Sequence, residues 1–480
     1  MRLGQTSVIY FISKVAASVI GFLATIYFTR TLGEDIYGFY AITLALVSWL
    51  GLVKSVGFGQ AIIKRMSEGE APNEYLAAGF ITKISLTLPV IIAIVVFSDQ
   101  VNAYVGQPVS EFVIVLLVVS ILKNIVSSAL KGTHRIHVYA PLFTLKEVGR
   151  SVSMVVLVAL SWGLSGMLAG HALGTLIIAI IGLWIVRPTV VVPKRHHFSQ
   201  LFDFAKFSWL GSMRKKTFSE MDILVLGAFV SSGYVGIYSV AYTLGKFLDT
   251  FGDAMESTLF PELSKQSSSG DVNMVRALTN DALSYAGLFL IPGVVGAEIL
   301  GERLMLLYGE GFGIGTHVLT ILLLGILAYS YNKQLLNTLN AIDRPDLAFR
   351  ANAVFIGANL VLNVALVYSI GWIGAAIATA TSAAIGLVCS FYYTRRHVGF
   401  RVPVGEISRQ ILAALFMGIV VYSARAVGET HPVAAYNEVF VVSLVGLGAA
   451  VYFLVLLAIS RTFRTTVSRN LPVDVPLAGS

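Results

Sequence analysis

Charge is what this sequence has least of. Only 12% of its 480 residues are charged, whereas 56% are hydrophobic. A soluble globular domain carries about a quarter charged residues. Apolar runs of about 20 residues recur from one end of the chain to the other, and a helix of this length crosses the hydrocarbon core of a bilayer. The composition therefore excludes an ordinary soluble domain and predicts an all-α polytopic membrane protein of the cell membrane.

Cysteine and catalytic motifs are scarce as well. The single cysteine, Cys389, lies in an apolar run, so no internal disulfide can form. His134, His137, His196 and His197 lie in connectors between the apolar runs, where we expect them to be solvated, so we expect neither a metal nor another cofactor. The chain has no Walker A sequence, no nucleophile elbow and no polar segment long enough to hold a glycosyltransferase site. These absences argue against an enzyme.

The hydrophobic pattern predicts about fourteen transmembrane helices joined by short connectors. Their expected ranges are 8–29, 36–62, 76–97, 109–130, 141–162, 164–186, 207–229, 234–259, 278–299, 315–340, 347–368, 371–393, 409–426 and 434–459.

Lysine and arginine are unevenly distributed between these connectors. The chain has 34 lysines and arginines, and those in the last turn at either end of a span are counted here with the neighbouring connector. By this count 20 fall at the termini or after even-numbered spans, and 3 fall after odd-numbered spans. The other 11 lie within spans. Because positively charged connectors stay in the cytoplasm, both termini are predicted to be cytoplasmic. The same rule accounts for the net charge of +8 without a nucleic-acid partner.

An internal repeat predicts two similar halves. The segment GEDIYGFYAI (Gly33–Ile42) opens the second span, and SSGYVGIYSV (Ser231–Val240) opens the eighth. A proline in the third span and the arginine after the fourth also have counterparts six spans later. Two six-helix bundles in the same orientation, related by pseudo-symmetry, form a common transporter architecture with the substrate site between them.

The repeat divides the chain into four expected parts. They are an N-terminal six-helix lobe at 1–190, a C-terminal six-helix lobe at 191–398, two additional spans within 399–460, and a cytoplasmic tail at 461–480 without regular structure.

Charged residues inside the spans are candidates for function, because charge in hydrocarbon is costly. Six lysines lie about five to eight residues from the cytoplasmic end of their spans, which is roughly 8–12 Å deep. They are Lys14, Lys54, Lys83, Lys123, Lys146 and Lys333. A lysine side chain can extend its ammonium group to the lipid headgroups, and this alone can explain the positions of Lys14 and Lys146. Six such residues together favour a water-filled, cationic vestibule that attracts an anion such as phosphate.

The eighth span also carries a stripe of charge. Lys246, Asp249, Asp253 and Glu256 are spaced 3, 4 and 3 residues apart and so share one helical face. Two interpretations remain open. Asp249, Asp253 and Glu256 could couple transport to H⁺ or Na⁺, or the charges could neutralise one another as part of the structure.

Several motifs resemble those of one known family. They are FTRTLGEDIYGFYAI (Phe28–Ile42), SVGFGQAIIKRMSE, VGIYSVAYTL with LFPELS, LYGEGF, LNAIDRPDLAFRANAVFIGANLVLNVALV and GWIGAAIATATSA. Their order and spacing over nearly the whole chain are similar to the Wzx-type polysaccharide flippases of the multidrug/oligosaccharidyl-lipid/polysaccharide exporter superfamily.

The resemblance implies a function and a set of candidate residues. It implies two six-helix bundles plus two C-terminal helices that move a polyprenyl-linked glycan, joined through phosphate or diphosphate, from the inner to the outer leaflet. Glycan assembly machinery and membrane lipid are the implied partners. Basic residues of the central cavity are implied to meet the phosphate. By depth and span, the candidates here are Lys54, Lys123, Arg214, Lys215, Lys216 and Lys333.

Two other functions are weighed against this one. A multidrug or cation antiporter of the same superfamily should have an acidic, aromatic cavity. In the first lobe, six bases stand against Glu147 as the one acid expected to be buried in the spans. A membrane-embedded glycan-lipid enzyme would need paired carboxylates or a histidine beside a sizeable loop, and the sequence has neither arrangement.

Overall fold

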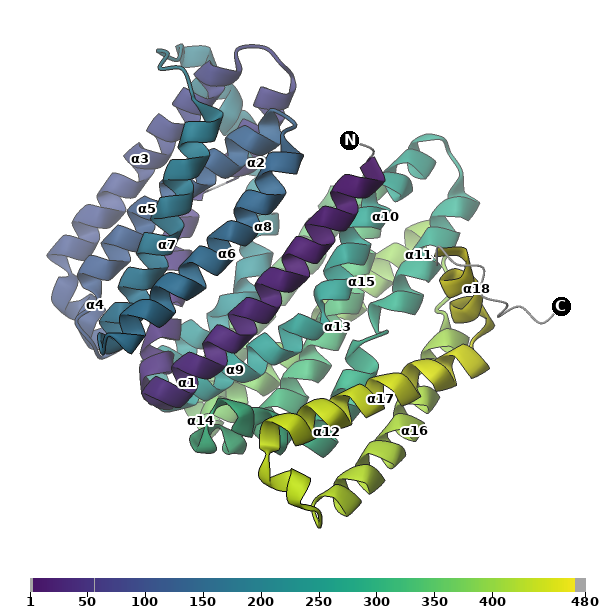
Figure 1. The fold of residues 1–480 in the computed structure, drawn as a ribbon. Helices are drawn as coiled ribbons and strands as arrows, with labels where there is room; N and C mark the ends of the chain where they lie inside the picture. The colour runs from purple at the N-terminus through teal and green to yellow at the C-terminus, as the bar shows by residue number, and fades with distance from the viewer. Residues whose placement is uncertain (1–2, 56, 471–480) are drawn as a thin grey trace. The chain divides into compact units, whose positions relative to one another are not determined.

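The computed structural model describes the backbone of residues 3–55 and 57–470 and the side chains of residues 18–52, 57–205, 213–256, 258–432 and 434–468. All the regular secondary structure of these residues is helical, with no strand among them (Figure 1). Contacts divide it into two compact units, Met1–Ile237 and Tyr238–Ser480. The predicted all-α class is confirmed.

The described residues of the first unit form eight helices and the start of a ninth. They are α1 (Leu3–Ser55), α2 (Phe58–Ser67), α3 (Pro72–Val96), α4 (Ser98–Val105), α5 (Ser110–Gly132), α6 (Ile136–Ala159), α7 (Gly163–Val186), α8 (Arg195–Phe229) and α9 (Ser232–Leu248). Within this unit α6 packs along α7 and α1, and α7 also packs along α5. The helix α8 packs against α1, α2 and α3.

The second unit continues from α9. It contains α10 (Thr250–Ser268), α11 (Val272–Ala286), α12 (Leu290–Met305), the short 3₁₀ helices η1 (Leu306–Tyr308), η2 (Glu310–Gly315) and η3 (Pro432–Ala435), and then α13 (Thr316–Ala341), α14 (Pro345–Ile370), α15 (Trp372–Val398), α16 (Val404–Gly428), α17 (Asn437–Ile459) and α18 (Arg461–Asn470). Here α15 packs against α13 and α14, while α16 and α17 form an antiparallel pair (Figure 1).

Ten helical segments in the described part of the chain are long and apolar enough to cross a membrane. One of them, Ser18–Leu52, covers two of the predicted spans, which are separated by a kink at Gly33 where φ is 81°. Three further predicted spans fall on α6, α8 and α9, which are not among the ten. The reason is charge or length: α6 and α8 carry clusters of ionisable residues, and α9 has only 17 residues.

Three local predictions are wrong. The eighth span was expected as one helix over 234–259, but the helix is interrupted at Asp249, between α9 and α10. The second span, expected over 36–62, is interrupted where α1 ends at Ser55 and α2 begins after Gly57, which has a φ of 74°. The start of the tail is not irregular, because residues 461–470 form α18. The predicted lobe boundary at 190/191 differs from the division by contacts at 237/238, and the lobes stay a prediction.

A glycine ridge on α7 brings this helix unusually close to α6. A side-chain carbon at Gly170 would lie 2.5 Å from Met154 Cα, and one at Gly174 would lie 2.5 Å from Arg150 Cα. Glycines four residues apart let two membrane helices pack backbone against backbone. This contact fixes the charged residues of α6 beside the polar residues of α7.

Replacing Gly174 by alanine should therefore destabilise the protein. The added carbon must push the two backbones apart, and overpacking of this kind costs about 1–3 kcal/mol. The matched control is Gly21→Ala in α1, because no described atom beyond the adjoining backbone of the helix itself lies within 4 Å of the added carbon there. In a helix that change should be neutral or favourable by about 1 kcal/mol. Thermal unfolding in detergent gives the comparison, and equal midpoints for both variants would contradict the close approach.

A candidate anion cavity and a buried charge cluster

The helices α1, α5, α6, α7 and α8 of the first unit enclose a polar cavity of about 460 Å³. Its wall combines apolar side chains of α1 and α5 with hydroxyl, amide, imidazole and charged groups. The polar lining residues are Ser48, Ser120, Lys123, Asn124, Lys146, Arg150, His171, Thr175, Lys216 and Glu220.

Ion pairs neutralise only part of the basic charge around this cavity. Glu147 pairs with Lys146 and lies 2.9 Å from Arg150. Lys216 lies 3.7 Å from Glu220 and also donates a hydrogen bond to the Ser48 hydroxyl. Among the described side chains, Lys123 forms no ion pair, although it reaches the cavity.

The charge balance of the cavity is therefore positive. Among the side chains that the structure describes, four basic residues stand against Glu147 and Glu220, which leaves a formal excess of two positive charges. A recess with one sign of charge and low-dielectric walls focuses its field on the opposite sign. The site can thus attract an anion, and its ammonium and guanidinium groups can donate to phosphate oxygens.

His171 is a polar cavity residue that the sequence reasoning missed. It lies on α7, and its Nδ1 atom shares a 2.8 Å hydrogen bond with the Tyr40 hydroxyl of α1. Two signals could have found it. A histidine within an apolar span is itself unusual, and His171 adjoins the glycine ridge of α7 through Gly170.

The structure brings together only some of the predicted substrate-binding residues. Lys123 and Lys216 face the same cavity. Arg214 is half-buried and Lys215 is exposed, and neither lines the described cavity. The side chain of Lys54 lies outside the described residues. Lys333 belongs to the second unit.

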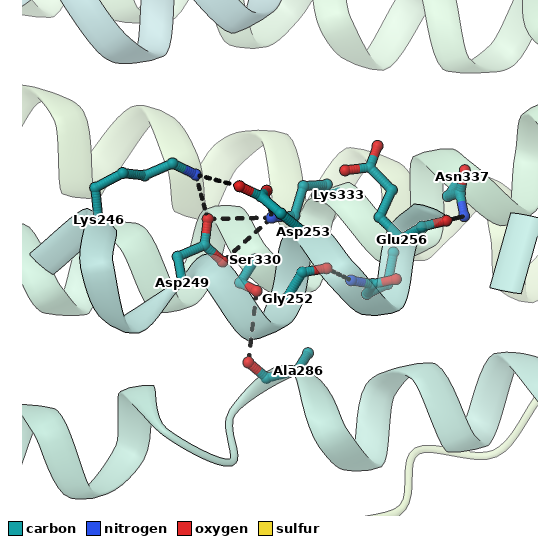
Figure 2. A network of polar contacts seen from close by, with 10 residues as sticks. Lys246, Asp249, Gly252, Asp253, Glu256, Ala286, Ser330, Lys333 and Asn337 are labelled. Atoms are coloured by element: carbon teal, nitrogen blue, oxygen red, sulfur yellow. Dashed lines mark hydrogen bonds and ion pairs between the residues drawn. The ribbon is translucent and has the colours of Figure 1, made fainter. Parts of the chain in front are cut away.

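Lys333 instead joins a cluster of four charges at the break between α9 and α10. Its Nζ atom lies 3.1 Å from an Asp249 oxygen and 2.5 Å from an Asp253 oxygen. Lys246 reaches the same two carboxylates at 2.5 Å and 3.4 Å. Figure 2 shows the two lysines and two aspartates pointing toward one another. Glu256 lies on α10, as Asp253 does, and its backbone carbonyl accepts a 3.1 Å hydrogen bond from the Asn337 side chain.

Because this cluster is buried, each of its charges depends on the others for compensation. The side chain of Asp249 is 0% exposed and that of Lys333 is 3% exposed. An isolated charge at such depth is costly, whereas two lysines and two aspartates balance one another. Nearby, Gln334 donates a 3.0 Å hydrogen bond to the Gly252 carbonyl, which holds the first turn of α10 against α13.

A larger cavity, of about 530 Å³, lies within the second unit but offers different chemistry. Leucine, isoleucine, valine and phenylalanine side chains line it, and Tyr331 is the one polar side chain that the described part of the chain contributes to its wall. It could not compensate a charged headgroup, so the polar cavity is the better candidate for anion binding.

Comparison with known proteins agrees with the motifs. A family model described as "Polysaccharide biosynthesis protein" matches residues 27–342. The chain is 30% identical over 478 residues to the "Probable flippase AglR" of Haloferax volcanii, covering 98% of each chain. The chain belongs to this polysaccharide biosynthesis family. The resemblance indicated by the sequence motifs is thereby confirmed, and the protein is a multi-pass protein of the cell membrane.

Other relatives and solved structures extend the comparison. The "Probable low-salt glycan biosynthesis flippase Agl15" of the same organism is 26% identical, with 99% of this chain and 100% of the relative covered. The fold is similar to "Lipid II flippase MurJ, inward closed conformation", with a TM-score of 0.78, 16% identity, and 96% and 99% of the two chains covered. An inward-facing MATE multidrug transporter gives a TM-score of 0.63 at 15% identity, with 80% and 94% covered.

Removing one lysine from the charge cluster should lower the free energy of unfolding of the protein substantially. In Lys333→Met the buried Asp249 keeps only Lys246, and removing one partner of a buried ion pair typically costs about 3–5 kcal/mol. We expect a clear fall in the thermal midpoint of the detergent-solubilised protein. Lys265→Met, on the exposed end of α10, is the control and should leave the midpoint unchanged. A midpoint for Lys333→Met equal to that of the control would show that the cluster contributes nothing to stability.

Proposed function

We propose that this protein is a flippase that moves a polyprenyl-linked sugar or oligosaccharide from the cytoplasmic to the outer leaflet by alternating access. The transported lipid would serve assembly of cell-surface polysaccharide or glycoprotein. The observation that carries the proposal is the cavity with two excess positive charges, built from helices of a membrane protein. The relatives named as flippases support a transporter rather than a catalytic enzyme.

The physical difficulty of flipping explains what such a cavity has to do. A glycan-phosphate headgroup would lose its hydrogen bonds with water if it entered hydrocarbon. A wet, cationic cavity replaces these interactions with basic and hydroxyl side chains, while the prenyl chain remains in lipid. The proposed substrate linkage is phosphate or diphosphate, both of which are anions.

Lys123 is the leading candidate for the headgroup contact. It reaches the cavity without an ion pair among the described residues, so its charge remains available to a ligand. Lys216 is a second candidate, partly neutralised by Glu220. Lys54, Arg214, Lys215 and Lys333 stay predictions as substrate-binding residues.

Ion coupling through Asp249, Asp253 and Glu256 also stays a prediction. The contacts of the two aspartates support the structural interpretation, because Lys246 and Lys333 already compensate their charges. For either aspartate to exchange H⁺ or Na⁺, at least one of these ion pairs would have to open during transport.

Export of organic cations fits the polar cavity less well. MATE transporters share the fold, but a site for a cation needs an acidic or aromatic surface. Here basic residues outnumber acidic ones around the cavity by four to two.

The proposed topology has fourteen spans, two six-helix lobes at 1–190 and 191–398, two further spans and both termini in the cytoplasm. The helices α6 and α8, which have 24 and 35 residues, are long enough to cross despite their charge. That charge faces, in part, the polar cavity rather than lipid.

Single cysteines test this topology in a Cys389→Ala background. Gln100→Cys and Thr430→Cys should react with an impermeant thiol reagent added outside intact cells. Ser67→Cys and Ser269→Cys should react only after the membrane is opened. All four positions are exposed in the structure, so differences in labelling report the side of the membrane. The reversed labelling pattern would overturn the orientation.

Neutralising Lys123 tests the flippase directly. Lys123→Gln removes the charge but keeps most of the packing of the stem, and loss of a charge-assisted contact costs about 1.5–3 kcal/mol, or roughly 10- to 150-fold in affinity. The measurement is the rate at which a lipid-linked glycan becomes protected in proteoliposomes at subsaturating substrate. Lys64→Gln, an exposed residue that lines no described cavity, is the control. If both variants flip at the wild-type rate, the cavity is not the headgroup site.

A further inference from the structure

A second, smaller cavity of about 170 Å³ adjoins the polar cavity between α5, α6 and α7. The two cavities share Lys123, Asn124 and Lys146 in their walls. A ligand held at these three residues therefore faces both spaces at once. The smaller cavity has no role in the function described so far.

The lining of the smaller cavity differs in kind from that of the larger one. Beyond the shared residues it contains the hydroxyl-bearing side chains Ser127 and Tyr139 and the aromatic ring of Phe143. None of the described residues in its wall carries a carboxylate. The rings of Tyr139 and Phe143 lie with their centroids 6.0 Å apart. The Nζ atom of Lys146 lies over the Phe143 ring, 4.6 Å from its centroid, and this contact restrains the Lys146 and Phe143 side chains.

These groups match the chemistry of a neutral sugar. A pyranose ring presents hydroxyls that both donate and accept hydrogen bonds, and C–H faces that pack on apolar surface. An amide and two hydroxyls offer both donors and acceptors, and aromatic rings with a few placed polar groups are typical of small-ligand sites. An additional anion would instead require further positive charge, which the residues found only in this cavity do not supply.

The order of residues along α5 sets the spacing between the two cavities. Ser120 lines only the larger cavity, Lys123 and Asn124 line both, and Ser127 lines only the smaller one. From Asn124 to Ser127 the helix rises about 4.5 Å. This distance is comparable to the separation between a phosphate and the sugar bonded directly to it.

We propose that the smaller cavity is a subsite for the sugar attached directly to the phosphate, with Asn124, Ser127 and Tyr139 as its hydrogen-bonding groups. The inference rests on the proposed function, because it takes Lys123 as the phosphate contact. The basic residues then supply attraction to any prenyl phosphate, and the neutral groups distinguish a glycosylated one from a bare one.

The test compares two ligands on the purified full-length protein in detergent. One is a short-chain prenyl phosphate, and the other is the same lipid carrying a single hexose, chosen as the tightest-binding of a panel of hexoses. In wild type the hexosyl form should bind more tightly. Ser127→Ala and Tyr139→Phe each remove one hydroxyl and should weaken binding of the hexosyl form by about 2- to 13-fold per hydroxyl. Binding of the bare lipid should not change.

Two controls separate the possible failures. Ser128→Ala removes the hydroxyl of the next residue, which lines neither described cavity, and should change neither affinity. Lys123→Gln should weaken both ligands if the phosphate assignment holds. If Ser127→Ala and Tyr139→Phe weaken both ligands equally or neither, the sugar subsite is overturned, whatever Lys123→Gln does. If Lys123→Gln leaves both affinities unchanged, the phosphate site of the proposed function fails, and the subsite fails with it.

Discussion

The cost of holding charge away from water governs how the polar residues of this protein are arranged. An ion removed from water costs several kcal/mol unless a partner or a wet cavity compensates it. In the second unit the charges at the α9–α10 break compensate one another. In the first unit Lys123 faces a cavity, while Glu147 and Glu220 neutralise only part of the charge around it. The same constraint thus produces a balanced cluster in one unit and an anion-attracting cavity in the other.

Two of the five helices that line the cavity, α6 and α8, carry clusters of charged residues. Neither α6 nor α8 is among the segments apolar enough to span a membrane on composition alone. Both supply charged residues to the cavity. Their position is secured by close packing, as where Gly170 and Gly174 bring α7 against the backbone of α6. Hydropathy is therefore weakest as a guide where a membrane transporter carries its function.

Attraction and selection are assigned to different side chains in the proposed site. Positive charge acts at long range and does not distinguish one phosphate from another. Neutral donors and acceptors act only in contact, and a group that is left unpaired in a buried site penalises the wrong ligand. A shared wall at Lys123 and Asn124 lets one headgroup experience both effects. This arrangement would make glycosylation of the lipid a condition for tight binding.

The sequence by itself determined the all-α membrane class and the family, and it located the stripe of Lys246, Asp249 and Asp253. These follow from properties of single segments, because hydrophobic length, loop charge and helical spacing act on the residues of one helix at a time. Only the tertiary structure decided that Lys333 pairs with that stripe, 80 or more residues away in the chain, and that the helix breaks at Asp249. It also decided that His171 joins Lys123 and Lys216 around one cavity. Such groupings depend on which helix faces pack together, and side-chain volume and backbone approach across several helices set that packing rather than the pattern along any one of them.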